Sequence, residues 1–320
     1  PGRASGSDPH RAATPRHRPQ SEKGSWISPL TQAGKVRVVG NGVPLPMGRA
    51  IAKLAKSGTR VLQIGAGFIG CELAASMKSH GVDVVLLEPQ PTPLASVLGP
   101  TVGALVERLH RNEGIDVRVG TGLTSLSGDG AVAAATLSDG SEIPVDVVAI
   151  GVGSVPVTGW LDGSGIELDN GVLCDGVGRT STEHVWAVGD VASWQIGDRR
   201  KRVEHWTNAG DQAKILAGAI TGTGDPDAPA QVPYFWSDQY DKKLQMAGLS
   251  GGAEEWAVRG DMASGAFSVY HYKSGKLLAV DSVNSPKDHL QARKLLDAGV
   301  SPSLEQAADI AFDLGSLLLK

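Results

Sequence analysis

The stretch Val61-Leu-Gln-Ile-Gly-Ala-Gly-Phe-Ile-Gly70 decides how the central part of this chain folds. Its first four residues read as a short buried strand and lead directly into a Gly-x-Gly-x-x-Gly loop, after which a helical pattern begins. In such a loop Gly65 permits the tight turn, Gly67 lets a pyrophosphate approach the backbone, and Gly70 lets the helix pack close to the strand. The phosphates then lie on the helix N-terminus, whose free N–H groups favour an anion. We therefore predict a dinucleotide-binding βαβ unit at 61–88.

The second strand of this unit ends in an acidic residue, Glu88, about 20 residues after the glycine loop. A carboxylate at this place accepts hydrogen bonds from the adenosine ribose hydroxyls and repels a 2′-phosphate. Pro89, Gln90 and Pro91 follow, so no adjacent arginine offers a site for such a phosphate. The predicted ligand is NADH rather than NADPH. The alternative is a glycine-rich strand–helix turn that holds no ligand.

Strands and helices alternate around the glycine loop, which predicts a parallel sheet. We expect strands at 60–64, 82–88, 116–120 and 145–150, helices at 48–56, 68–80 and 102–112, and a hairpin at 131–144 that turns at Asp139-Gly140. A second α/β segment follows, with a strand at 185–188, a helix at 208–220 and a linker at 221–230. The remaining strands, at 244–249, 256–259, 267–272 and 277–283, precede a helix at 286–298 and another near the C terminus. That order predicts a separate α+β domain.

Composition excludes several classes of protein. The chain has 320 residues and a net charge of −4, which gives no basic footprint for nucleic acid. Its two cysteines have no metal-ligand spacing, and we expect both to be buried thiols in a reducing compartment. The longest apolar stretches are only strand-sized, and residues 1–20 lack the apolar core of a secretory signal. We therefore predict a cytoplasmic protein that contacts neither membrane nor nucleic acid and holds no metal.

Several motifs in consistent order resemble the FAD-dependent, NADH-using ferredoxin reductases that supply oxygenase systems, the relatives of putidaredoxin and rubredoxin reductases. The segments that carry the resemblance are Gly65–Ala74, Thr92–Ala95, Arg179–Ser181, Val185–Asp190, Val203–Trp206 and Pro233–Tyr240. The similarity runs from about Gly48 to the C terminus. It implies FAD and NAD as cofactors, and a ferredoxin-type iron–sulfur protein as the electron acceptor.

The resemblance also implies a division of the chain. Residues 1–46 are expected to be irregular or disordered, and 47–155 to form a Rossmann-like NAD-binding domain. Residues 156–230 correspond to the C-terminal part of an FAD-binding domain, and 231–320 to a C-terminal α+β reductase domain. The expected fold class is therefore α/β, with a parallel-sheet NAD domain, a partial FAD domain and an α+β end.

Individual positions take their expected roles from the same resemblance. Glu72 falls where the family places a glutamate near the nicotinamide; alternatively it is an acid that stabilises a helix start. Gly151 and Gly153 match a strand end beside the nicotinamide, although Val157 stands where the family often has Asn. The pair Gly189-Asp190 resembles the motif whose aspartate holds the flavin ribityl hydroxyls, and its simpler reading is a turn with an N-cap. No side chain is expected to act as an acid or base.

Two tryptophans and a basic run each have two alternative assignments. Trp206 and Trp236 would lie near the flavin edge in such a fold, or else pack as ordinary aromatic residues. Arg199–Arg202 could steer an acidic ferredoxin, or could be a solvated loop. The complete set of predicted cofactor-binding residues is Gly65, Gly67, Phe68, Ile69, Gly70, Glu72, Glu88, Gly151, Gly153, Gly189, Asp190, Trp206 and Trp236.

The resemblance is incomplete at the start of the chain. A complete member begins with its own glycine loop for FAD, and none is visible before Gly48. Val36–Gly42 imitates one in part, but Val43-Pro-Leu-Pro46 cannot continue as a helix because proline lacks an N–H. There is also no Cys-x-x-x-x-Cys pair for dithiol chemistry. The alternatives are thus a truncated NAD-binding remnant without flavin or turnover, or another NADH-dependent flavoprotein, such as a nitrite- or monodehydroascorbate-reductase relative.

Overall fold

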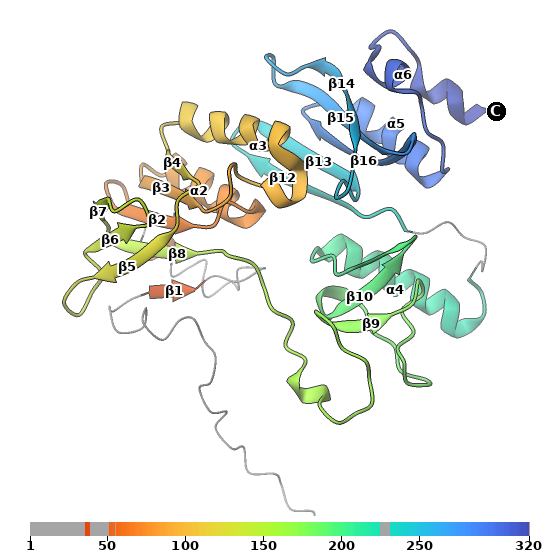
Figure 1. Ribbon diagram of the computed structural model, residues 1–320, viewed down its shortest axis with the longest axis horizontal. Helices are drawn as coiled ribbons and strands as arrows, with labels where there is room; N and C mark the ends of the chain where they lie inside the picture. Colours follow the sequence, from red (N-terminus) through yellow and green to blue (C-terminus); the bar gives the residue numbers. More distant parts are fainter. Residues whose placement is uncertain (1–35, 39–50, 55, 225–230, 320) are drawn as a thin grey trace, which may run out of the picture.

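A five-stranded parallel sheet, in the order β1-β8-β2-β3-β4, organises the first part of the protein (Figure 1). The computed structural model describes residues 36–38, 51–54, 56–224 and 231–319. The strands of this sheet are β1 (Val36–Val38), β2 (Arg60–Ile64), β3 (Asp83–Glu88), β4 (Asp116–Val119) and β8 (Val147–Ile150). Every neighbouring pair in it is parallel, which confirms the prediction from the alternation of strands and helices.

Strand β1 lies inside the segment 1–46, which we expected to be irregular. It pairs with β8, where Val36 is the register partner of Val148. The expectation therefore fails for these three residues, because the open edge of β8 offers a ladder of backbone hydrogen bonds that the local sequence does not reveal. The rest of that segment, including most of the imitation loop Val36–Gly42, is outside the described residues.

Two helices connect the parallel strands. Helix α2 (Phe68–Ser79) follows the glycine loop, as predicted. Helix α3 (Ala95–Asn112) begins seven positions before the predicted helix 102–112, and is kinked at Gly99, whose φ is 71°. Pro100 removes a helical donor at the same place. The first turn was therefore hidden from the sequence pattern by a Gly-Pro pair that normally ends a helix. Residues 51–54 are also helical, within the short helix predicted at 48–56.

A small antiparallel sheet, β5-β6-β7, extends from this unit. Its strands are β5 (Leu123–Ser127), β6 (Ala134–Leu137) and β7 (Glu142–Pro144). The hairpin predicted around Asp139-Gly140 is confirmed by the β6–β7 pairing, and Gly140 has the positive φ, 82°, that such a turn favours. Strand β5 was not predicted, because its mostly exposed residues carry little alternation.

The middle of the chain forms a second unit with its own small core. It contains η2 (Gly159–Leu161), β9 (Val172–Cys174), η3 (Gly189–Val191), β10 (Ala192–Ile196), β11 (Arg199–Lys201) and helix α4 (Trp206–Thr221). The three strands form a sheet in the order β11-β10-β9, packed around buried Trp194. Helix α4 confirms the prediction at 208–220, and residues 225–230 of the predicted linker are outside the described residues.

The strand predicted at 185–188 is wrong. Only an isolated bridge joins Arg179 to Trp186, and the strand β10 begins four residues later. The backbone of this segment pairs instead with the preceding turn, since Ala187 donates to the Gly178 carbonyl at 3.0 Å. The Ala187 carbonyl accepts the indole N–H of Trp194 at 2.8 Å. These local partners satisfy the backbone without a sheet ladder.

The last part of the chain is an antiparallel sheet in the order β12-β13-β16-β15-β14, followed by helices, as predicted for an α+β unit. Its elements are β12 (Tyr234–Gln239), β13 (Lys242–Gly248), β14 (Glu255–Asp261), β15 (Ala266–Lys273), β16 (Lys276–Val283), α5 (Pro286–Asp297), α6 (Leu304–Ala308) and η4 (Leu314–Leu319). The residues of β12 were noted only as part of the motif Pro233–Tyr240, and no strand was predicted there.

This antiparallel sheet lies between two layers (Figure 1). On one side Tyr270, Val280 and Leu295 belong to a core formed with α5 and the C-terminal segment. On the other side Met246 and Phe267 share a core with residues of the parallel-sheet unit, among them Val102 and Val106 of α3. The C-terminal sheet is therefore not a separate body: it is packed directly on the helices of the parallel-sheet unit.

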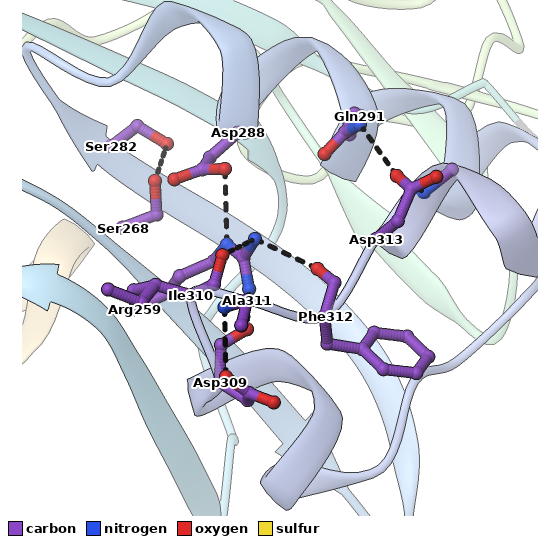
Figure 2. Close-up of polar contacts among 11 residues, drawn as sticks. Arg259, Ser268, Ser282, Asp288, Gln291, Asp309, Ile310, Ala311, Phe312 and Asp313 are labelled. Carbon is purple, nitrogen blue, oxygen red and sulfur yellow. Dashed lines mark hydrogen bonds and ion pairs between the residues drawn. The ribbon is translucent and has the colours of Figure 1, made fainter.

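A buried arginine fixes the end of the chain to the sheet. Arg259 on β14 is 5% exposed, and its guanidinium donates to the carboxylate of Asp288 at 3.1 Å (Figure 2). It also donates to the backbone carbonyls of Ile310 at 3.2 Å and Phe312 at 3.1 Å, and to that of Asp309. One side chain thus donates to three carbonyls of a segment that is neither helix nor strand.

Candidate functional site

A cavity of about 850 Å³ opens at the carboxyl ends of β2 and β8. In open α/β sheets, ligands bind at the carboxyl ends of strands, where neighbouring connections diverge. The start of α2, the β11–α4 segment, and strands β12, β13 and β16 supply its walls. Residues from all three units thus face one space, and its volume is at the upper end of the range for small-molecule sites.

The three loop glycines have three different environments. Gly65 has a φ of 90°, and a Cβ there would lie 2.3 Å from the carbonyl oxygen of Gly151. A Cβ on Gly70 would lie 2.0 Å from the carbonyl oxygen of Gly65, so the helix can approach the loop only without a side chain. A Cβ on Gly67 would meet no atom within 4 Å, and Gly67 lines the cavity. Gly65 and Gly70 therefore shape the turn, whereas Gly67 leaves room beside it.

Glu88 holds the loop but does not line the cavity. One carboxylate oxygen accepts the backbone N–H of Ala66 at 2.7 Å, and the other accepts that of Gln90 at 2.9 Å. The acid at the end of β3 is therefore anchored beside the glycine loop, where the dinucleotide-binding pattern predicts it.

Glu72 lies one turn into α2 and lines the cavity. Its Oε1 accepts a hydrogen bond from the hydroxyl of Ser237 at 2.7 Å. Burial raises the pKa of this carboxyl, and the hydrogen bond from Ser237 opposes that rise. Because a side chain of the C-terminal sheet engages Glu72, it is more than a charge that stabilises the start of a helix.

The Gly189-Asp190 pair is in a single 3₁₀ turn before β10. The N–H of Gly189 donates to the side-chain oxygen of Gln212 on α4 at 2.8 Å, whereas the Asp190 side chain is exposed and lines the cavity. The guanidinium of Arg202 donates to the Asp190 carbonyl at 3.1 Å and forms an ion pair with Glu204. It also donates to the carbonyl of Ser154, so it fixes this wall to the segment that leaves β8.

Aromatic rings form the rim on the side of β12 and α4. The rings of Trp206 and Trp236 are 5.7 Å apart and nearly perpendicular, and Trp206 is 70% exposed. Phe235 meets Phe68 edge-to-face at 4.8 Å, which joins β12 to the start of α2. The ring of His205 lies 5.4 Å from that of Trp236. Both predicted tryptophans are therefore at the cavity, and their packing against each other accounts for part of their position.

The basic run Arg199–Arg202 is largely occupied within the chain. Arg199 donates to the carbonyl of Leu249 at 3.2 Å, and Arg200 to that of Cys174 at 2.8 Å. Arg202 is held by the contacts described above. The guanidinium groups of all three arginines in the run therefore connect the β11 segment to neighbouring elements. This arrangement favours a structural role for the arginines over a free docking surface.

Most predicted site residues meet at the cavity, and three do not line it. Gly65, Glu88 and Gly189 lie beneath or beside its wall. Those that line it are Gly67, Phe68, Ile69, Gly70, Glu72, Gly151, Gly153, Asp190, Trp206 and Trp236.

Of the wall contributed by the C-terminal sheet, sequence reasoning predicted only Trp236. Asp281 on β16 lines the cavity, is 4% exposed, and accepts a hydrogen bond from His271 at 2.7 Å. Burial raises the pKa of Asp281. Met246 and Ser250 also line this wall. An acidic residue in the mostly apolar run 277–283 was the available signal.

The two cysteines are buried and free. Burial raises the pKa of Cys71, and also raises that of Cys174 to about 11, so neither is a ready thiolate. The described residues contain no group of three or more His, Cys, Asp or Glu side chains placed to hold a metal ion. Within the same part of the chain, no helix combines the length and the apolar character that crossing a membrane requires.

A parallel sheet with a glycine loop and an acidic second-strand end, joined to an antiparallel sheet that closes the cavity, defines a nucleotide-binding α/β protein. The family described as pyridine nucleotide-disulphide oxidoreductase matches residues 4–213, and the reductase C-terminal family matches 234–318. The chain therefore belongs to the pyridine nucleotide-disulphide oxidoreductase family and ends in a reductase C-terminal domain.

Individual relatives show which members of this family the chain is similar to. The chain is 41% identical over 254 residues to rhodocoxin reductase of Rhodococcus erythropolis, an alignment that covers 78% of this chain and 59% of the relative. It is 41% identical over 248 residues to a ferredoxin–NAD(P)(+) reductase of a Sphingomonas species, covering 75% and 59%. In the crystal structure of the covalent putidaredoxin reductase–putidaredoxin complex, a chain matches with a TM-score of 0.83 and 30% identity, over 90% of this chain and 73% of that one. These matches confirm the recognised resemblance to ferredoxin reductases. The chain spans about 59% of the length of the first two relatives.

Proposed function

We propose that this chain is the NAD-binding and acceptor-facing part of a flavin-dependent reductase that passes electrons from NADH to a ferredoxin-type iron–sulfur protein. The observation that carries the proposal is the cavity itself. It brings the start of α2, with Gly67 and Glu72, to the same space as Asp190 of the middle unit. Two nucleotide-site signatures, far apart in the sequence, face each other there.

The proposed NAD site fits the glycine loop. The first N–H groups of a helix have no partner within it, no side chain caps the start of α2, and the space beside its N-cap residue Gly67 is open. A pyrophosphate could approach the backbone at this point, where no Cβ is in the way. Glu88 would hold the adenosine ribose, and Glu72, Gly151 and Gly153 would surround the nicotinamide end.

The proposed flavin site fits one wall of the cavity. Asp190 presents an exposed carboxylate suited to the hydroxyls of a polyol, and Trp206 and Trp236 present apolar ring surfaces to a flat group. FAD, when bound, supplies the chemistry that takes up a hydride and releases electrons singly. The residues of this chain would align the two rings and exclude water. The described residues show no second glycine loop for the adenosine part of FAD.

The names of the relatives support the proposed acceptor. One is named as a rhodocoxin reductase and another as a ferredoxin–NAD(P)(+) reductase, and the solved complex joins putidaredoxin reductase to putidaredoxin. We extend that class of partner to this chain, with no role for nucleic acid or membrane. We also place the protein in the cytoplasm, because its cysteines are free thiols, as a reducing compartment requires.

Flavin uptake and acceptor choice test the proposal directly. The purified chain, mixed with FAD and desalted, is expected to retain flavin and to reduce a ferredoxin at the expense of NADH. A chain that binds NADH but retains no flavin would instead be a remnant without turnover. Reduction of ferricyanide but of no ferredoxin would identify another type of NADH-dependent flavoprotein. Titration with NADH alone measures the dinucleotide site independently of either result.

The choice between NADH and NADPH is expected to depend on Glu88. The wild-type chain should bind NADH more tightly than NADPH, because the carboxylate repels the 2′-phosphate. Glu88→Gln keeps the two backbone hydrogen bonds in part but removes the charge, so the ratio of the two dissociation constants should fall about 10-fold. Equilibrium titration of both dinucleotides measures it. Asp83→Asn, at the exposed start of the same strand, is the matched control and should leave the ratio unchanged.

A further inference from the structure

A continuous chain of hydrogen bonds runs through the buried interface between the parallel-sheet unit and the C-terminal sheet, and ends at Glu72. Tyr240 contacts Nδ1 of His110 at 3.0 Å, and Nε2 of His110 contacts the side-chain oxygen of Gln239 at 3.1 Å. The amide nitrogen of Gln239 donates to the Ser237 hydroxyl at 3.1 Å, and that hydroxyl donates to Glu72 at 2.7 Å. Four links thus join Tyr240, in the turn directly after β12, to the cavity.

The chain has one consistent direction. Ser237 has a single proton, which it gives to Glu72, so it must accept from the amide nitrogen of Gln239. The amide oxygen of Gln239 is then the acceptor for Nε2–H of His110. Burial lowers the pKa of His110 to about 4, so the imidazole is neutral at pH 7 and its Nδ1 accepts from the Tyr240 hydroxyl. Every donor points toward Glu72.

The central residues of this hydrogen-bond chain are buried, whereas its last residue, Glu72, faces the cavity. Ser237, Gln239 and His110 each have 0% exposure, and none of them lines the cavity. Glu72 does line it. Neutral buried polar groups contribute little net stability compared with apolar side chains of similar volume, so their arrangement has to be explained by more than packing. The result of this arrangement is a charge-assisted hydrogen bond from the Ser237 hydroxyl to the Glu72 carboxylate, which fixes the position of that carboxylate.

We propose that Ser237, Gln239 and His110 are positioning residues that hold the Glu72 carboxylate toward the carboxamide of the nicotinamide. The inference rests on the NAD function proposed above, and deepens it. A carboxylate on a flexible stem of two methylene groups loses rotamer freedom when it binds a ligand, and an anchor that fixes it beforehand lowers that cost. Because the anchor belongs to β12 and the carboxylate to α2, the nicotinamide end of the site exists only where the two units pack together.

Two ligands separate this role from a purely structural one. NAD⁺ reaches Glu72 through its nicotinamide, whereas ADP-ribose ends before it and contacts only the glycine loop and Glu88. Ser237→Ala is expected to weaken NAD⁺ binding about 10-fold, the usual effect of losing a hydrogen bond to a charged group, and to change ADP-ribose binding less than 2-fold. Calorimetric titration of the full chain measures both. In the Glu72→Ala background, Ser237→Ala should have no further effect, since it acts through that carboxylate.

A second variant keeps the inference testable if Ser237→Ala folds poorly. Tyr240→Phe removes only the terminal hydroxyl, and should weaken NAD⁺ binding more than ADP-ribose binding, by a smaller factor. Nitrogen-15 NMR of His110 should show the proton on Nε2. The opposite tautomer, equal losses for both ligands, or no loss in either variant would each overturn the positioning role. A wild-type chain that binds neither ligand would overturn the NAD site itself.

Discussion

Gly67→Ala is expected to weaken NADH binding about 100-fold while the protein remains as stable as the wild type. The backbone at Gly67 has φ −72° and ψ −178°, an extended conformation open to any residue, and a Cβ there meets no atom within 4 Å. The added methyl therefore creates no steric clash in the fold. It occupies the space through which a pyrophosphate must reach the first N–H groups of α2, and the loss of about 2.8 kcal/mol corresponds to two charge-assisted hydrogen bonds. Titration with NADH and thermal unfolding measure the two effects.

Two other glycines serve as controls for this variant. Gly70→Ala places a methyl group 2.0 Å from the carbonyl oxygen of Gly65, so it should lower stability together with binding. Gly210→Ala in α4 meets nothing within 4 Å and should leave NADH binding unchanged. If Gly67→Ala bound NADH like the wild type, the pyrophosphate would not lie on this loop, and the proposed NAD site would be incorrect.

Arg259→Met is expected to lower the free energy of unfolding by about 3 kcal/mol, because a partly buried carboxylate and three backbone carbonyls lose the guanidinium donor, and of these carbonyls that of Asp309 keeps a second donor, the N–H of Phe312. Asp288 loses its ion-pair partner, and the segment Asp309–Phe312 loses its attachment to β14. Methionine has a similar length and fills much of the same space, so the change tests the hydrogen bonds rather than the volume. Chemical denaturation followed by fluorescence measures the effect.

The matched control is another arginine–aspartate pair, at the surface. Arg60 and Asp146 are 2.6 Å apart, but their side chains are 46% and 42% exposed. Water takes over the interactions of both groups when the pair is broken, so Arg60→Met should leave the unfolding midpoint nearly unchanged. Equal effects of the two substitutions would show that Arg259 contributes only as an exposed charge does.

The nucleotide-binding unit could be predicted from sequence because its signals are local. An apolar strand, three glycines at fixed spacing and an acid at the end of the next strand all fall between residues 61 and 88. A Cβ on Gly70 would clash within the loop itself, with the carbonyl oxygen of Gly65. A Cβ on Gly65 would clash with the carbonyl oxygen of Gly151, a partner at the end of β8 that the local sequence does not show. The C-terminal strands were equally clear from their alternation, and only β12 was overlooked.

What could not be predicted depends on contacts between distant parts of the chain. His110 and Tyr240 are 130 positions apart, and nothing in the pattern of α3 indicates that this histidine ends up in a polar interface. The kink at Gly99-Pro100 hid the first turns of α3 because local propensity opposes a helix there. The segment 185–188 has the composition of a strand, yet its backbone finds partners in a turn. Asp281 reaches the cavity only because the whole C-terminal sheet is packed on α2 and α3.

The core that the C-terminal sheet shares with the parallel-sheet unit should also hold the protein together after its polypeptide is cleaved. The segment after β8 is highly exposed, with Val152, Val155 and Val157 at 70%, 86% and 81%, and such a stretch is a preferred site for proteases. A nick there severs the polypeptide but not the interior that Met246 and Phe267 share with α3. The two pieces would therefore elute together on gel filtration and separate only under denaturation. Units that are separated by an exposed linker in the sequence thus remain associated through their common core.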